Sequence, residues 1–315
     1  MTKYILKRIL IAIPTLLGIT MIDYAIMCFA GSPLEMLQGA RISQEAIAAK
    51  EAAMGLDKPF YIQYFIWLGQ LLSGNMGYSV KSYEAVNAMI GSHLGPTLLL
   101  MGVSLIVSLI MSVPAGIYSA IHQYSKGDYA VVTASFFGSS IPGFFLSLLL
   151  VYLFTVNLGI LPSGGMTTLG TAGGAADVAA HMVMPVLVLS VSMAGTNIRY
   201  IRSAMLEILQ QDYLRTARAK GIGRRMVIYK HALRNALLPV VTYIGPMVAS
   251  IVTGSFVIET VFGIPGVGQL FTDSIVNRDY PLIMGITVFF AVLLVLAVLI
   301  VDLVYVLIDP RIKLD

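Results

Sequence analysis

Residues 282–308 read LIMGITVFFAVLLVLAVLIVDLVYVLI, and Asp302 is the only charged residue among them. A helix needs about 20 predominantly apolar residues to cross the hydrocarbon core of a bilayer, so this run is long enough to span a membrane. Five further apolar runs of similar length precede it, approximately at residues 9–30, 97–121, 129–156, 182–204 and 237–262. The sequence therefore predicts an all-α integral membrane protein whose six transmembrane helices form a single domain over residues 1–315.

Composition agrees with a membrane protein, because 57% of the 315 residues are hydrophobic and 11% are charged, whereas soluble domains carry roughly 25% charged residues. The first apolar run follows Lys3, Lys7 and Arg8 as a signal peptide would, but it is longer than a signal h-region and lacks an A-x-A site. We expect an uncleaved helix. Cys28, the only cysteine, excludes an internal disulfide or a metal cluster and is expected to be buried among apolar side chains.

The distribution of Lys and Arg predicts the orientation, because short cytoplasmic loops are enriched in them. With the N-terminus inside, only five of the 20 basic residues fall on the outer side, namely Arg41, Lys50, Lys58, Lys81 and Arg278. Both termini are therefore expected in the cytoplasm. The net charge of +4 reflects this topology, and no basic soluble domain is present that would indicate a nucleic-acid partner.

Three segments are expected outside. Residues 31–96 contain a candidate amphipathic helix at 43–54 and an aromatic helix with Tyr61, Tyr64, Phe65 and Trp67. Residues 157–181 are rich in glycine and predict an irregular loop. The third outer segment runs from residue 263 to residue 281.

Several signatures of catalytic sites are absent from the sequence. It contains no G-x-x-x-x-G-K-[ST] phosphate loop, no H-E-x-x-H and no G-x-S-x-G. The histidines lie far apart and are expected to be interfacial or hydrogen-bonded: His93, His122, His181 and His231. The sequence therefore predicts no enzyme, no catalytic residue, no metal site and no cofactor on this chain.

Residues 212–239, DYLRTARAKGIGRRMVIYKHALRNALLP, differ from the apolar runs on either side. Nine basic residues lie between Arg199 and Arg234. We predict one short helix over 212–220, a break at 221–223 and a second helix from about 224 to 237, before Pro239. Two short helices joined at glycines form a compact bracket on the cytoplasmic side, suited to docking against a partner.

This segment, within a predicted loop at 205–236 between the fourth and fifth spans, resembles the cytoplasmic coupling loop, or EAA motif, of permease subunits of ATP-binding-cassette importers. Arg215-Thr216-Ala217 stand where the motif has Glu-Ala-Ala, Gly221 follows, and Leu238-Pro239 come later than in the short consensus. The missing glutamate departs from the general pattern, but RTARAKG with HALRNALLP is similar to the peptide and nickel permease branch. The resemblance implies that an ATPase subunit holds this loop in a cleft. The implied coupling residues are Arg215, Thr216, Ala217, Arg218, Ala219, Lys220 and Gly221, supported by His231, Asn235 and Pro239.

The resemblance extends over most of the chain. Its further motifs are YILKR at 4–8, IPT at 13–15, MGLDKPFYIQYFIWLGQLLSGNMGYS at 54–79, ETVF at 259–262, PGVG at 265–268, DLVY at 302–305 and DPR at 309–311. It implies one permease subunit of a peptide importer in the inner membrane of a prokaryote. The implied partners are a second, different permease, two cytoplasmic ATPases that bind ATP and Mg²⁺, an extracytoplasmic binding protein and the peptide.

Charged residues inside membrane spans are functional candidates because their burial in lipid is costly. Candidates for the pathway or an outer gate are Asp23, Glu259, Phe262, Pro265 and Gly266. For Asp23 three roles are open: it lines the pathway, makes a helix contact or stays protonated. For Glu259 two roles are open: it belongs to a gate or caps a helix. Asp302, near the expected inner face, has either a structural role, paired with Arg311 or the basic loop, or a functional one. Polar residues after Met182 either line a pore or bond between helices: Ser190, Ser192, Thr196 and Asn197.

Three alternatives to peptide import remain open on the sequence. The same machinery serves other cargo, such as nickel, a nickel chelate or a glycan, in the branch that the chain resembles. An ion-driven secondary transporter is a second alternative, although the inverted repeats expected of one are not evident. A membrane scaffold or sensor is the third.

Overall fold

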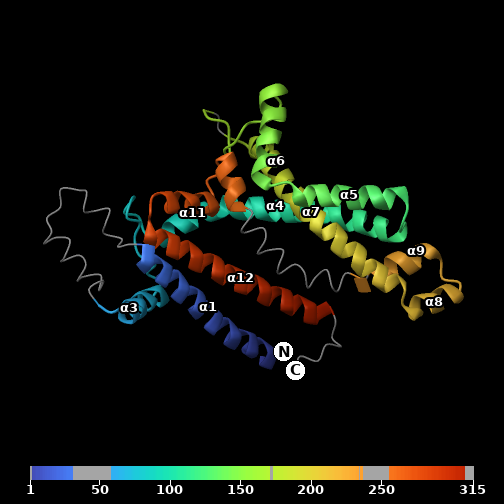
Figure 1. Ribbon diagram of the computed structural model, residues 1–315, viewed down its shortest axis with the longest axis horizontal. Helices are drawn as coiled ribbons and strands as arrows, with labels where there is room; N and C mark the ends of the chain where they lie inside the picture. Colours follow the sequence, from blue (N-terminus) through green and yellow to red (C-terminus); the bar gives the residue numbers. More distant parts are fainter. Residues whose placement is uncertain (1, 31–57, 171–172, 234, 237–254, 309–315) are drawn as a thin grey trace. The chain divides into compact units, whose positions relative to one another are not determined.

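The computed structural model describes residues 2–30, 58–170, 173–233, 235–236 and 255–308 (Figure 1). Helices dominate these ranges, and a single antiparallel bridge joins Tyr78 and Ala85. The chain divides into two compact units. Unit 1 comprises residues 1–95 and 270–295, and unit 2 comprises residues 96–269 and 296–315.

Unit 1 is built on the long helices α1 (Thr2–Ala30) and α12 (Tyr280–Ile308) with the short helix α3 (Phe60–Leu72). Thr20 on α1 shares a 3.0 Å hydrogen bond with the hydroxyl of Tyr64 on α3, and the rings of Tyr24 and Trp67 lie 5.6 Å apart. The aromatic helix predicted at this point is confirmed. The buried members of this cluster are Tyr24, Met27, Tyr64, Tyr280 and Met284.

A tight turn before α4 (Val86–Ile121) is hydrogen-bonded to the residues between α11 (Val267–Val276) and α12. Ser79 donates a hydrogen bond to the Asp279 carboxylate, and the backbone N–H of Val80 donates to the same carboxylate at 3.2 Å. Lys81 Nζ donates to Asn277 Oδ1 at 3.0 Å. A polar turn is therefore held against the start of α12.

Helix α4 begins eleven residues before the predicted span at 97–121, so it extends into the predicted outer segment at 31–96. Pro96 was taken as a boundary, yet the helix continues through it and through Pro114. Prolines are tolerated inside membrane helices because neighbouring groups satisfy the freed backbone. A proline therefore does not by itself end a helix in this chain.

Unit 2 is organised around α7 (Ala175–Leu209), its most extensively buried helix. Ser190 Oγ donates to the Ser104 carbonyl at 3.0 Å, and Asn197 Nδ2 donates to Ser108 Oγ at 3.1 Å, which joins α7 to α4. Of the two roles considered for Ser190 and Asn197, the structure shows the bond between helices. At Gly195, α7 comes so close to α5 (Lys126–Ser140) that an added Cβ would lie 2.9 Å from the Ser139 backbone nitrogen.

The third predicted span, 129–156, is not one straight helix. Helix α5 ends at Ser140, α6 (Gly143–Leu150) continues as a π-helical stretch over Val151–Asn157, and the two halves are bent by 97°. Ile141 is extended (φ −73°, ψ 124°) because the ring of the following Pro142 disfavours the α conformation at the residue before it. The prediction of a continuous helix was wrong at this point.

The fifth predicted span, 237–262, falls largely outside the described residues. Its last part is helical over Ser255–Phe262 and meets α11 at a bend of 82°. The predicted outer segment at 263–281 therefore contains the helix α11. The loop predicted at 157–181 is irregular as far as Gly170, but α7 already begins at Ala175.

Within the part of the chain that the structure describes, four helices are long and apolar enough to cross a membrane, over Leu10–Phe29, Val86–Ile121, Ala175–Leu209 and Tyr280–Ile300. The number rises to six if each bent pair counts as one span. Three histidines are hydrogen-bonded as predicted, each to the carbonyl four residues earlier: His93, His122 and His181. Cys28 is exposed on α1, so the prediction that it is buried was wrong, because it lies on a face that the described helices do not cover. The helix predicted at 43–54 and the side chain of Asp302 lie outside the described residues.

Candidate functional site

The basic segment forms the predicted pair of short helices. Helix α8 (Asp212–Ala219) is followed by α9 (Arg224–Met226), which continues as a π-helical stretch over Val227–Ala232. Gly221 has φ +78°, and the N–H of Ile222 donates to the Ala217 carbonyl at 3.2 Å. This is the glycine C-cap that ends many helices. We call residues 212–236 the coupling hairpin.

One face of the coupling hairpin is anchored in a hydrophobic core. Leu214, the anchor of α8, is fully buried. The core combines hairpin residues with residues near the C-terminal ends of α4 and α7: Ile117, Ala120, Ile201, Met205, Leu214, Val227, Ile228, Ala232 and Ala236. The hairpin is therefore packed directly against these two helices.

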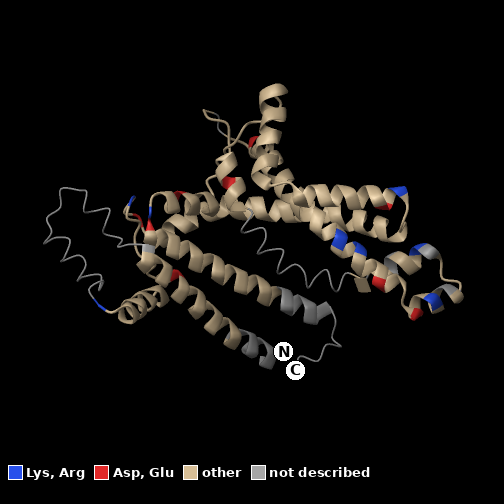
Figure 2. Cartoon of the chain, in the orientation of Figure 1, with Lys and Arg blue, Asp and Glu red and all other residues tan. Residues whose placement is uncertain are grey.

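The opposite face of α8 is exposed. The predicted coupling residues with exposed side chains or backbone are Arg215, Thr216, Ala219, Lys220 and Gly221, whereas Ala217 is half-buried against the core. Arg215 lies 3.6 Å from Asp212, an exposed pair that contributes little to stability. Figure 2 shows Lys and Arg gathered on the last part of α7 and on α8 and α9. This surface is available to a partner.

Of the three residues predicted to support the loop, Asn235 is the one whose side chain is described. Its Nδ2 donates to the hydroxyl of Tyr213 at 2.8 Å, which ties the second arm of the hairpin to α8. The side chains of Arg218 and His231, and all of Pro239, lie outside the described residues. Their predicted roles stay predictions.

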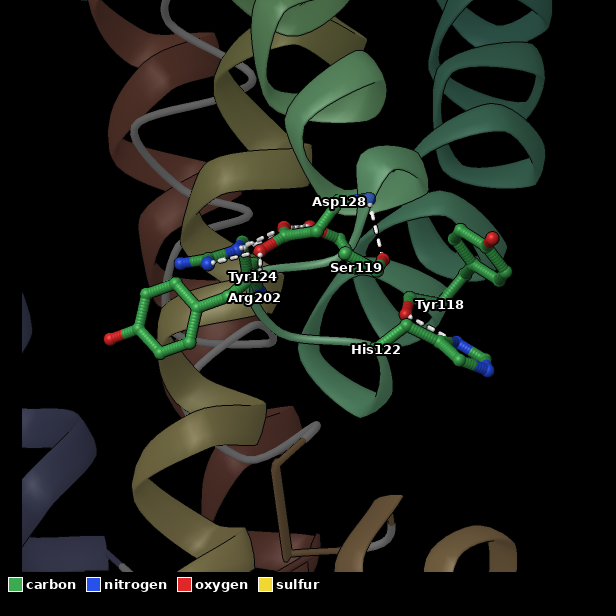
Figure 3. A network of polar contacts seen from close by, with 7 residues as sticks. Tyr118, Ser119, His122, Tyr124, Asp128 and Arg202 are labelled. Carbon is green, nitrogen blue, oxygen red and sulfur yellow. Dashed lines mark hydrogen bonds and ion pairs between the residues drawn. The ribbon is translucent and has the colours of Figure 1, made fainter.

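A partly buried ion pair beside the hairpin was missed by the sequence analysis (Figure 3). Arg202 on α7 donates from Nε and from a terminal nitrogen to the two carboxylate oxygens of Asp128, both at 2.8 Å. Ser119 on α4 donates to the same carboxylate, and the N–H of Tyr124 donates at 2.9 Å. The only signal was Ser125-x-x-Asp128, a helix-start pattern whose Ser125 Oγ accepts the Asp128 N–H at 3.1 Å.

Glu259 is fully buried and caps α11. Its carboxylate accepts hydrogen bonds from Thr97 Oγ1 at 2.9 Å and from the N–H groups of Gly268 and Gln269 at 2.7 and 3.1 Å. Thr97 in turn accepts the N–H of Val267 at 2.8 Å. Of the two roles considered for Glu259, this geometry is that of the helix cap.

The structure brings three of the predicted gate residues together. Phe262 is buried in the helix of Glu259, and its carbonyl accepts the N–H of Gly165 from the glycine-rich loop at 2.7 Å. Gly266 must be glycine, since an added Cβ would overlap the Glu259 carboxylate and the Thr97 hydroxyl. Pro265 is exposed on the turn. Asp23 belongs to unit 1, where its buried Oδ2 has no hydrogen-bond partner among the described residues.

Comparison with known proteins assigns the chain to a family. Residues 112–314 match the family described as the binding-protein-dependent transport system inner membrane component, and residues 1–100 match the corresponding N-terminal family. The chain is 46% identical to the oligopeptide transport system permease protein AppB of Bacillus subtilis (strain 168), covering 99% of this chain and 100% of AppB. It is 40% identical to the dipeptide transport system permease protein DppB of the same strain, covering 100% of this chain and 99% of DppB.

A solved structure supports the fold. The inward-facing MetNI methionine ABC transporter contains a chain that aligns with 70% of this chain and 96% of its own length, with a TM-score of 0.58 and 18% identity. At that identity the likeness concerns the fold alone. With its length matched by the two family descriptions and by AppB and DppB, the chain belongs to the family of inner membrane components of binding-protein-dependent transport systems.

Proposed function

We propose that the chain is a transmembrane permease subunit of an ATP-driven, binding-protein-dependent importer of oligopeptides or dipeptides, and that it forms half of the translocation pathway. The full-length similarity to AppB and DppB supports the peptide cargo. The observation that carries a role in coupling is the hairpin itself. It exposes the polar face of α8 and buries Leu214 against the ends of α4 and α7.

Coupling in this proposal runs through α8. An ATPase subunit receives the face that carries Arg215 and Thr216, and ATP with Mg²⁺ binds and is hydrolysed on the ATPases. When two ATPases close, α8 moves, and the core around Leu214 passes the movement to α4 and α7. This chain holds no cofactor and performs no catalysis in that cycle.

The proposed topology has six spans in a single domain over residues 1–315, with each bent helix pair counted as one span and both termini cytoplasmic. A second permease completes a heterodimer, and the extracytoplasmic binding protein docks on residues 31–96. The assembly lies in the inner membrane of a prokaryote. Asp23 lines the pathway, and the cluster of Glu259, Phe262, Pro265 and Gly266 holds an outer gate.

Replacement of Gly221 tests the coupling role. An L-residue in the left-handed region costs roughly 1–2 kcal/mol, and Asn tolerates that region better than a β-branched residue. No atom lies within 4 Å of a Cβ added at Gly221, so any effect comes from the backbone conformation. We expect Gly221→Val to abolish ATP-driven uptake and Gly221→Asn to retain a large part of it.

The measurement is uptake of tritiated dialanine and pentaalanine by proteoliposomes that contain the chain with its partner permease, ATPases and binding protein. Normal uptake by Gly221→Val would remove the coupling role from this loop. Uptake by the parent protein that persists without ATP would favour the ion-driven transporter. Uptake of neither peptide, with ATPase activity stimulated by the loaded binding protein, would indicate a different cargo.

A further inference from the structure

The Asp128–Arg202 ion pair is built to hold three helices in one arrangement. The exposed fractions of the two side chains are 3% for Asp128 and 23% for Arg202. Each carboxylate oxygen receives one nitrogen of the guanidinium fork and one further donor, from Ser119 or Tyr124. A bidentate fork fixes geometry as well as charge. A buried pair of this kind is weak evidence for stability as such, because desolvation offsets its attraction.

The pair lies directly behind the core of the coupling hairpin. Ser119 is placed between two core residues of α4, Ile117 and Ala120, and Arg202 follows the core residue Ile201 of α7. The described members of that core include no residue of α5. The hairpin therefore contacts α4 and α7 directly. The start of α5 is joined to α4 by the turn at residues 122–125 and by the close packing of Gly127 on Tyr118, and the ion pair adds a charged, directional link to α7.

A second contact between α5 and α7 lies nearer the other end of α5. Gly195 packs against the Ser135 carbonyl and Ser139, and Arg199 donates to Ser139 Oγ at 3.0 Å. In the first turn of α5, the ion pair is a polar link to α7, and Gly127 packs against the Tyr118 side chain of α4. Beyond it, α5 continues through the bend at Pro142 into α6.

We propose that Asp128 and Arg202 are a positioning pair for energy coupling, which makes the start of α5 move together with the coupling hairpin when the partner ATPases close. This inference rests on the proposed function. The pair touches neither cargo nor nucleotide in this scheme. It acts by joining α5 to the helices that the hairpin moves, and lysine cannot replace Arg202 because a single ammonium lacks the planar fork.

Two single-cysteine reporters can separate the movement of α5 from that of the hairpin. In a Cys28→Ala background, which removes the chain's only cysteine, one reporter is Lys126→Cys on α5 and the other is Arg225→Cys on α9. Both native side chains are exposed. The chain is purified with its partner permease and ATPases, and the rate of maleimide labelling is measured with and without ATP and vanadate.

We expect nucleotide to change the labelling rate at both reporters when the pair is intact. In Asp128→Asn and in Arg202→Lys, the change at position 126 should shrink at least about fivefold, the lower end of ordinary coupling between sites, while the change at position 225 persists. Asp128→Asn/Arg202→Gln removes both charges, so no lone buried charge disturbs folding, and the same loss is expected. Arg199→Lys is the matched control on α7 and should keep the response.

An undiminished response at position 126 in the pair variants would overturn the proposal. Recovery of the labelling response at position 126 in the double variant would also overturn the proposal, because it would mean that the pair only avoids a lone buried charge. An equal loss of that response in Arg199→Lys would overturn it as well. No response at position 225 in the parent would instead count against the hairpin as the coupling element, and thus against the proposed function.

Discussion

Among the described residues, four buried or partly buried carboxylates stand at the beginnings of helices, and Asp23, in the middle of α1, is an exception. Asp128 lies in the first turn of α5, Glu259 caps α11, and Asp279 directly precedes α12. Asp177 lies in the first turn of α7, where it accepts two hydrogen bonds from Thr168 at 2.7 and 2.8 Å. Free N–H groups and the helix dipole stabilise negative charge at these ends. At the residue scale, an acidic group in an apolar chain can therefore stabilise the start of a helix, and it need not line a transport pathway.

Glu259→Ala should lower the stability of the protein. It leaves the N–H groups of Gly268 and Gln269 and the hydroxyl of Thr97 without their acceptor, and an unsatisfied buried donor costs about 1–3 kcal/mol. Glu259→Gln keeps one carbonyl oxygen and should lie between the two. The measurement is thermal unfolding in mild detergent.

Asp273→Asn, which alters an exposed carboxylate on the same helix α11, serves as the control and should leave the unfolding temperature unchanged. If Glu259→Ala unfolds at the parent temperature but loses uptake, the cap is not the main role of this carboxylate. That result would favour the pathway role considered for it.

At the scale of elements, the coupling hairpin joins a short polar helix to a hydrophobic anchor. An eight-residue helix such as α8 is marginal on its own in water, and its stability comes from tertiary packing of its apolar face. Leu214 provides that packing with no exposed surface. The same residue therefore both holds α8 in helical form and connects it to α4 and α7.

Leu214→Ala should uncouple ATP hydrolysis from uptake. Truncation of a buried leucine costs about 2–5 kcal/mol, and because 1.4 kcal/mol is tenfold, we expect uptake per ATP hydrolysed to fall about tenfold or more. Leu214→Met nearly conserves volume and should cost less than about 1.5 kcal/mol. Both rates are measured on the same proteoliposomes. Equal ratios for Leu214→Ala and for the exposed-site control Met226→Ala would show that the anchor does not transmit the movement.

At the scale of the whole molecule, the basic residues divide the chain into two sides. Arg225 belongs to the basic hairpin, and Lys81 belongs to the polar turn fastened to Asn277. From the positive-inside rule we predict that the first lies in the cytoplasm and the second outside.

Single cysteines in the Cys28→Ala background test this sidedness. A membrane-impermeant maleimide applied to intact spheroplasts should label Lys81→Cys at once and should label Arg225→Cys only after the membrane is permeabilised. The reverse pattern, or labelling of both in intact spheroplasts, would contradict the proposed topology and with it the docking of α8 on cytoplasmic ATPases.

The amino-acid sequence alone determined the class of the protein, the position of most of the apolar helices and the two arms of the coupling hairpin. These features depend on composition over about 20 residues or on a local signal such as Gly221, whose φ of +78° is the conformation that glycine tolerates without a Cβ penalty. Local signals of this kind can be recognised from the sequence without knowledge of the tertiary structure.

Only the tertiary structure decided which prolines break a helix and which polar groups meet. Pro14, Pro96, Pro114 and Pro185 lie inside continuous helices, whereas α5 ends beside Pro142, because packing around each proline determines whether the freed backbone groups are satisfied. Asp128 and Arg202 are 74 residues apart, Thr97 and Glu259 162, and Ser79 and Asp279 200. Such contacts depend on how helices distant in sequence pack together, and no local pattern of residues specifies that packing.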